Sequence, residues 1–117
     1  MSKNNHVSLI EFPIKNLKEI KQVKAFYQQI FGWTFNDWGD DYIDTHASGL
    51  PIGFNADKEH RSVQPLTVIY KDHLEDAKQQ VLTAGGTITR DIFSFPGGRR
   101  FHFRDPFGHE LAIWSDK

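Results

Sequence analysis

The sequence lacks several features that would assign a function class directly. It contains no cysteine, which excludes a disulfide framework and thiol chemistry. Its 14 Lys and Arg against 15 Asp and Glu give a formal net charge of −1. With no basic block, that balance argues against nucleic acid as the main partner. The opening segment MSKNNHVSLIEF has no long apolar run, so neither a signal peptide nor a membrane span is expected, and a cytoplasmic protein is the default. No HExxH, phosphate loop or Ser–His–Asp ordering is present.

Aromatic residues, in contrast, are plentiful. The chain has 10 Phe, 3 Tyr and 3 Trp, and 38% of its 117 residues are hydrophobic. That content is enough for one domain with its own core, or for two small halves that share a core.

The most informative stretch is Phe93–Trp114. Pro96–Gly98 predicts a tight turn, and Asp105–Gly108 has the Asp, Pro and Gly positions of a type I turn. Between the turns, Arg99–Arg104 alternates charged or polar residues with aromatic ones, which predicts a strand with two different faces. A second strand follows at His109–Trp114.

The two parities of these strands have different chemistry. Phe101 and Phe103 lie on the face expected to pack on a helix. The other face combines cations, an imidazole, a carboxylate and an indole, and it carries Arg100, His102, Arg104, Glu110, Ala112 and Trp114. We expect any function to lie on this second face.

The first half of the chain predicts a strand, a helix and further strands. Val7–Ile14 alternates so that Ile10, Phe12 and Ile14 face a helix and Glu11 faces away. Asn16–Phe31 has the helical apolar period, with Asn16 and Glu19 spaced as a capping box and Gly32 as its end. Short strands are then expected at Trp33–Phe35, Tyr42–Thr45 and Gly49–Asn55.

The second half repeats this order. Leu66–Tyr70 predicts a strand by its β-branched content, and Asp72 with Glu75 repeats the capping pattern of a helix that Gly85-Gly86 ends. Thr87–Phe95 and the stretch already described supply three more strands. The prediction is an α+β fold, with residues 1–117 as one domain built from two βαβββ modules, approximately 7–58 and 65–115. A single module would expose its apolar sheet face, so we expect the two to share a core around a cleft, with the helices outside.

The motifs FYQQIFGW, the GG after the second helix and RDPFGHELAIW resemble the vicinal oxygen chelate superfamily, the group of glyoxalase I, bleomycin-resistance proteins and extradiol dioxygenases. The resemblance covers roughly Val7 to Ser115. It implies paired βαβββ modules that form a cup-shaped cleft, and commonly a homodimer.

The resemblance does not extend to the metal ligands. Enzymes of this superfamily typically use His or Glu on the first and last strands of each module. Carried over by position, these places fall at Leu9, Leu66 and Ala112, none of which offers a nitrogen or oxygen donor. We therefore predict no bound catalytic metal.

An alternative site stays open. A two-residue displacement on the first and last strands would bring in Glu11 and Glu110, which with His102 form a non-standard set for zinc, nickel, iron or manganese. In the structural alternative, Glu11 and Glu110 pair across strands with Arg100 or Arg104. In a third, at least one of the two carboxylates contacts a ligand directly.

Without a metal, the predicted cleft still has the groups of a small-molecule site. Arg100 suits a carboxylate or phosphate, and His102 can act as acid, base or donor near neutral pH. Trp114, with Tyr70 and Trp33 as further candidates, can stack on a flat ligand. The predicted lining comprises Leu9, Glu11, Val68, Tyr70, Arg100, His102, Glu110, Ala112 and Trp114.

The remaining histidines have structural interpretations. His109 falls on the helix-facing parity and is read as structural, while His46 and His60 are read as solvated surface residues.

The residues and the resemblance together favour a glyoxalase/bleomycin-resistance-like protein that binds a small organic ligand as a cytoplasmic homodimer without the usual metal. One alternative is a metal-dependent glyoxalase-like lyase, isomerase or dioxygenase that uses Glu11, His102 and Glu110. Another is an interaction module whose cleft is filled by its own aromatic side chains.

Overall fold

A computed structural model describes residues 2–117. The chain divides into two compact units. Residues 9–65 form one, here called the N-terminal unit; residues 2–8 together with 66–117 form the other, the C-terminal unit. Each unit is described by itself.

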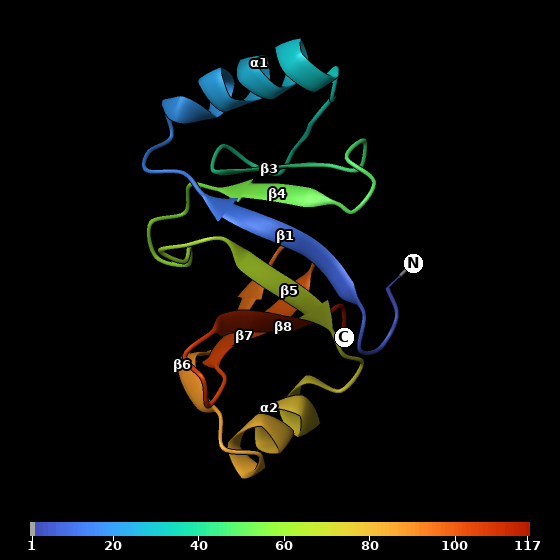
Figure 1. The fold of residues 1–117 in the computed structure, drawn as a ribbon, viewed down its shortest axis with the longest axis vertical. Coiled ribbons are helices and arrows are strands. Elements are labelled where there is room, and N and C mark those ends of the chain that lie inside the picture. The colour runs from blue at the N-terminus through green and yellow to red at the C-terminus, as the bar shows by residue number, and fades with distance from the viewer. Residues whose placement is uncertain (1) are drawn as a thin grey trace. The chain divides into compact units, whose positions relative to one another are not determined.

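The N-terminal unit contains a mixed four-stranded sheet and one helix (Figure 1). Strand β1 (Val7–Pro13), whose first two residues belong to the other unit, leads into helix α1 (Glu19–Phe31). The order across the sheet is β2-β3-β4-β1, with β1 parallel to β4 and the other pairs antiparallel. The remaining strands are β2 (Asn36–Asp37), β3 (Tyr42–Thr45) and β4 (Ile52–Asn55).

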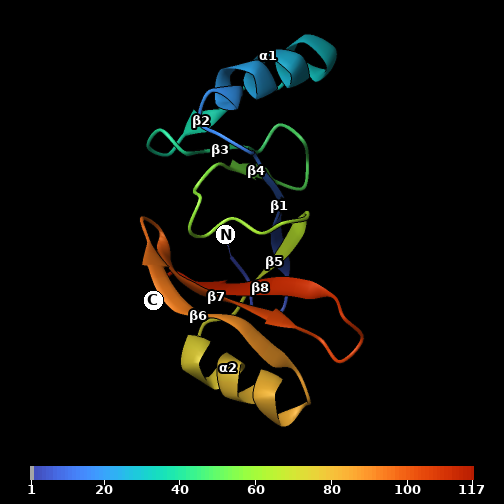
Figure 2. The same cartoon turned by 90° about the vertical axis from the view of Figure 1, so that its left-hand side faces the viewer.

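The C-terminal unit repeats this plan (Figure 2). Its sheet has the order β5-β8-β7-β6, with β5 parallel to β8 and the other pairs antiparallel. Helix α2 (Leu74–Thr83) contacts β6, β7 and β8. The strands are β5 (Leu66–Tyr70), β6 (Thr87–Phe95), β7 (Gly98–Arg104) and β8 (Glu110–Ser115). The predicted α+β fold of two successive βαβββ units is confirmed.

Alternation along β1 places its residues as predicted. Phe12 and Ile14 lie with Ile20 and Tyr27 of α1 in the core of the N-terminal unit, and Phe54 of β4 completes that cluster. Glu11 points to the other side of the sheet because successive strand residues face opposite ways.

The two faces of the C-terminal sheet are likewise separated as predicted. Phe101 and Ile113 form a buried core with Leu74 and Ala77 of α2, and Phe103 packs against it. The side chains of opposite parity on β7 and β8 are therefore excluded from the contact with the helix.

Both predicted capping boxes are wrong. Helix α1 is preceded by Lys18, with no side-chain cap, and the Asn16 side-chain amide donates to the Glu19 carboxylate at 3.3 Å. The residue preceding α2 is His73, again without a side-chain cap. The Asp72 carboxylate accepts hydrogen bonds from side chains elsewhere in the unit, so it is not available to the helix N-terminus.

The predicted strand at Trp33–Phe35 is also wrong. The short strand β2 begins only at Asn36. The Trp33 ring stacks on Phe31 and Tyr27, with centroid distances of 4.8 and 5.7 Å. Packing on the helix replaces strand pairing at this position, and the aromatic composition cannot distinguish the two.

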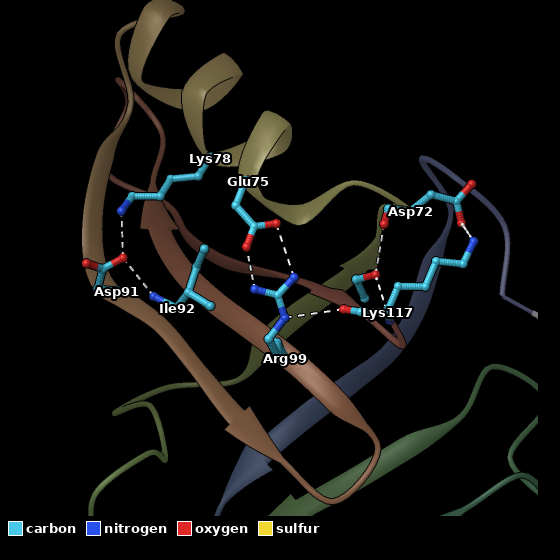
Figure 3. A network of polar contacts seen from close by, with 8 residues as sticks. Asp72, Glu75, Lys78, Asp91, Ile92, Arg99 and Lys117 are labelled. Carbon is cyan, nitrogen blue, oxygen red and sulfur yellow. Dashed lines mark hydrogen bonds and ion pairs between the residues drawn. The ribbon is translucent and has the colours of Figure 1, made fainter.

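Charged pairs connect α2 to its sheet (Figure 3). Arg99 of β7 binds the Glu75 carboxylate through two nitrogens, with Nη2 donating to Oε1 at 3.1 Å. Lys78 donates to Asp91 of β6 at 2.7 Å. The Arg99 hydrogen bonds lower the pKa of Glu75 to about 2.

The substitution Arg99→Gln should make the protein less sensitive to acid. Because the pKa of Glu75 is lower in the folded protein, its stabilising contribution is present above the ordinary value of 4.5 and is lost as the pH falls toward about 2. Wild type should therefore lose more stability over this interval than Arg99→Gln, as measured by urea unfolding at several pH values. A carboxyl NMR titration separates the two helix-to-sheet pairs, because Lys78→Gln relieves the lowered pKa of Asp91 and should leave the pKa of Glu75 at about 2. An ordinary Glu75 pKa in wild type would contradict the prediction.

Candidate functional site

The N-terminal sheet presents a polar face on the side opposite α1. One row across the strands runs Glu11, Gly53, Asp44 and Asn36, as the strand register aligns them. The side-chain amide of Asn36 donates to Asp44 at 3.2 Å. An apolar sheet face would have to be buried against another element. On this face, in contrast, polar side chains form hydrogen bonds with one another.

Glu11 is the centre of a hydrogen-bond network on this face. Its side chain is only 1% exposed. The Tyr42 hydroxyl donates to Oε2 at 2.9 Å, and the Asn55 side-chain amide donates to Oε1 at 3.1 Å. A buried carboxylate is costly unless it is hydrogen-bonded, so these donors offset part of the cost of burial.

Gly53 makes room for this network. A Cβ atom at this position would lie 2.3 Å from the Tyr42 hydroxyl oxygen and 2.9 Å from Cδ1 of Leu9. Both distances are far below van der Waals contact. The absence of a side chain at Gly53 therefore allows Tyr42 to reach Glu11, and it accounts for the position of Leu9.

The C-terminal sheet presents a different polar face on the side opposite α2. Its register aligns two rows of side chains across the four strands. One row consists of Val68, Ala112, His102 and Arg90, and the next of Tyr70, Trp114, Arg100 and Phe93. Beyond them, Arg104 lies opposite Glu110. We call these residues the cationic face. The structure thus brings seven of the nine predicted lining residues to one sheet face, namely Val68, Tyr70, Arg100, His102, Glu110, Ala112 and Trp114.

Phe93 contacts both polar side chains at the centre of the cationic face. The Arg100 guanidinium carbon lies 5.4 Å from the centroid of the Phe93 ring. The His102 ring meets Phe93 edge to face, with centroids 5.7 Å apart. Arg100 is 7% and His102 1% exposed, so both are held among other side chains. An aromatic ring beside a cation favours its charge and limits its motion.

Trp114 and Tyr70 form the aromatic part of this face. Their rings meet edge to face at 5.1 Å, and the Trp114 indole N–H donates to the Ser8 hydroxyl at 2.9 Å. The Tyr70 hydroxyl donates to Asp116 and Asp72 at 2.5 and 2.9 Å. The hydrogen bond to Asp116 is the main cause of the raised pKa of Tyr70. The Tyr70 hydroxyl is therefore protonated at neutral pH and is engaged by the two carboxylates.

Glu110 does not form either predicted arginine pair. Its Oε2 accepts a hydrogen bond from the Thr89 hydroxyl at 2.7 Å, although the strand register puts it opposite Arg104. Trp33, the third stacking candidate, packs on α1 in the N-terminal unit and does not belong to the cationic face.

His109 is exposed and does not face the helix, so its predicted orientation is wrong. Its Nδ1 lies 2.9 Å from Asp105 Oδ2, and its backbone N–H donates to Asp105 at the same distance. That N–H is the main cause of the lowered pKa of Asp105. The turn displaces His109 from the strand alternation, and its contacts there stabilise the turn. His46 is exposed as predicted, whereas His60 pairs with Asp57 at 2.7 Å.

Arg90 was missed because β6 does not alternate strictly, whereas Phe93 has the parity opposite to Ile88 and Ile92 and could have been assigned to this face by alternation. By simple alternation Arg90 would share a face with Ile88 and Ile92. The pairing of β6 with β7 shifts register between Ile88 and Arg90, and again between Arg90 and Phe93. Each shift is a bulge that moves the following residues to the other face. The first shift puts Arg90 opposite His102, and the second restores the original parity, so that Phe93 lies opposite Arg100. No turn residue in the sequence signals either bulge.

A sequence profile of the Glyoxalase/Bleomycin resistance protein/Dioxygenase superfamily matches residues 5–113. The chain belongs to this superfamily. The recognition made from the FYQQIFGW and RDPFGHELAIW motifs is therefore confirmed.

Solved structures of low sequence identity show the same fold. One titled NAD-dependent benzaldehyde dehydrogenase, from Legionella pneumophila, is 18% identical with a TM-score of 0.74, covering 93% of this chain and 98% of its own. A member of the superfamily from Vibrio splendidus 12B01 is 12% identical with a TM-score of 0.69, covering 96% and 99%. The Mn(II)-bound glyoxalase of Novosphingobium aromaticivorans is 18% identical with a TM-score of 0.65, and the match spans 99% of this chain but 40% of that one. No curated protein matches significantly.

The residues of this superfamily member do not fit the metal of its metal-binding relatives. Within residues 2–117, no three His, Cys, Asp or Glu side chains come together in a group that could hold a metal ion. At the positions implied by the resemblance, Leu66 and Ala112 are fully buried and Leu9 packs on Gly53. Hydrocarbon side chains provide no ligands there.

One surface hollow lies apart from the predicted site residues. It occupies about 550 Å³ in the N-terminal unit, and charged side chains of both signs dominate its lining. Asp41 belongs to it, and burial followed by the charge of Asp57 raises the pKa of Asp41. None of the nine predicted lining residues borders this hollow. Neither helix of the described chain combines the length and the apolar character needed to cross a membrane.

The substitution Gly53→Ala should disrupt the Glu11 network specifically. Its Cβ would displace the Tyr42 hydroxyl, leaving the buried carboxylate with one donor fewer. We expect a loss of about 1–3 kcal/mol in the free energy of unfolding, the usual cost of an unsatisfied buried group. Urea unfolding measures it.

Tyr42→Phe is the matched variant, because it removes the same donor without adding an atom. The double variant Gly53→Ala/Tyr42→Phe should lose less than the sum of the two single losses, since both act on one interaction. Additive losses would show that Gly53 does not act through Tyr42.

Proposed function

We propose that this chain is a small-molecule-binding protein of the glyoxalase/bleomycin-resistance type, and that the cationic face of its C-terminal sheet binds an organic ligand without a catalytic metal. One observation carries the proposal. This face collects three arginines, a histidine and aromatic rings on the side of the sheet that the helix core does not use. Apolar surfaces with a few convergent polar groups are typical of ligand sites.

The geometry supports a distinct contribution from each group. Arg100 has a planar donor fork that matches a carboxylate or phosphate, and Phe93 limits its motion. His102 offers a hydrogen-bonding or proton-transfer group beside it. The Trp114 and Tyr70 rings meet edge to face, offer aromatic surface for stacking, and are held by the hydrogen bonds of their polar ends. Leu9 and Glu11, on the polar face of the N-terminal sheet, stay predicted ligand contacts, and a homodimer stays the predicted assembly.

A metal-dependent lyase, isomerase or dioxygenase using Glu11, His102 and Glu110 is the competing function. The hydrogen bonds to Glu11 from Tyr42 and Asn55, and the Thr89 bond to Glu110, give both carboxylates protein partners. They support a structural role for these groups over a ligand set.

Elemental analysis of protein purified without chelator or a metal-binding tag separates the two functions. We expect no stoichiometric zinc, nickel, iron or manganese, because the superfamily positions carry Leu9, Leu66 and Ala112. One equivalent per chain in wild type, lost in both Glu11→Gln and Glu110→Gln, would contradict the proposal and favour the enzyme.

A thermal-shift screen of small organic compounds then tests binding, with affinities measured by calorimetry. For compounds that bind wild type, Arg100→Lys should weaken binding about tenfold, or about 1.4 kcal/mol, because lysine keeps the charge but loses the planar fork. Arg61→Gln, an arginine change in the N-terminal unit, should leave affinity unchanged. Equal affinities in wild type and Arg100→Lys, or a screen without binders, would contradict the proposed site.

A further inference from the structure

Arg90 has no protein partner for its charge. Its side chain is half-buried, and its Nε atom is buried without a hydrogen-bond acceptor anywhere in residues 2–117. It also forms no ion pair with any described side chain. Arg99 and Lys78 in the same unit, although more peripheral, each bind a carboxylate.

Such an arrangement does not help the free protein. A buried N–H without an acceptor costs free energy, and a partly desolvated cation adds to that cost when no anion lies beside it. Residues that oppose stability in this way are often kept for function, where the missing partner is supplied by a ligand.

The irregular pairing of β6 determines the face on which Arg90 lies. A register shift lies on each side of it, between Ile88 and Arg90 and between Arg90 and Phe93. Bulges occur next to binding sites because they redirect side chains. Without the first one, Arg90 would point to the face where Ile88 packs on the α2 core. With it, Arg90 lies directly opposite His102 on the cationic face.

We propose that Arg90 binds the anionic group of the ligand, and that the ligand is an organic acid with a flat apolar part. This inference rests on the proposed function, and it adds the ligand class and a binding residue. A carboxylate can accept from the buried Nε–H and a terminal N–H of Arg90 together, which is the geometry that a guanidinium offers. The apolar part of the acid then lies on the aromatic side chains of the same face, Phe93 and Trp114.

Benzoate is a suitable probe because it combines a carboxylate with a flat ring, and benzamide is its neutral counterpart. Binding is followed through the Arg90 Nε–H signal in 15N NMR spectra of the full chain. We expect benzoate to shift this signal downfield and to bind at least tenfold more tightly than benzamide. Arg90→Gln should weaken benzoate binding at least tenfold, and Arg61→Gln should not change it.

A stability measurement separates binding from structural support. In thermal unfolding without ligand, Arg90→Met should be as stable as wild type or more stable, because an unpaired charge is replaced by an apolar chain of similar length. Its melting temperature should no longer rise with benzoate. If Arg90→Met does not fold, Arg90→Lys is tested instead. It keeps the charge, but it should bind benzoate at least tenfold more weakly than wild type does.

Each other outcome overturns the inference. Equal benzoate affinity in wild type and Arg90→Gln shows that Arg90 is not the anion-binding residue, and equal affinity for benzamide excludes an acid as the ligand class. Inorganic phosphate that binds more tightly than benzoate reassigns the site to phosphoryl groups. If neutral compounds from the screen bind but benzoate does not, the inference fails and the proposed function stands. If nothing binds, both fail.

Discussion

Each sheet in this protein packs one helix against one face, and this constraint determines the chemistry of the opposite face. In the N-terminal unit, Phe12, Ile14 and Phe54 pack with residues of α1. In the C-terminal unit, Phe101 and Ile113 pack with residues of α2. Because strand residues alternate, every residue between them must face away from the helix. The polar side chains of these strands are therefore collected on the sheet faces opposite the helices.

The buried charged groups on the two polar faces differ in their hydrogen-bond partners. In the N-terminal unit, Glu11 accepts hydrogen bonds from Tyr42 and Asn55, and Gly53 provides the space for Tyr42. On the cationic face of the C-terminal unit the charges are mainly positive, and Nε of Arg90 has no acceptor among the described residues. The first arrangement is consistent with structural support, and the second is what a protein that binds an anion needs before its ligand arrives.

Membership of the superfamily is compatible with one structural polar face and one proposed ligand-binding face, because one fold hosts many functions. The positions at which the resemblance implies metal ligands hold Leu9, Leu66 and Ala112 here. The side chains of the proposed site lie elsewhere, with Arg90 on β6 and with Arg100 and His102 on β7. Function must then be inferred from those side chains and not from the fold.

The sequence by itself determined the element order, the turn at Asp105–Gly108 and the two faces of β1, β7 and β8, because strict alternation and turn residues are local signals. It also identified Arg100, His102 and Trp114 as neighbours on one face. Tertiary structure alone decided the helix starts, the packing of Trp33 on α1 and the position of Arg90. These three features depend on which of several possible partners a side chain contacts in the folded protein, and on where a strand bulges against its neighbour. Neither is encoded in the period of a single segment, since the bulges of β6 arise only when it pairs with β7.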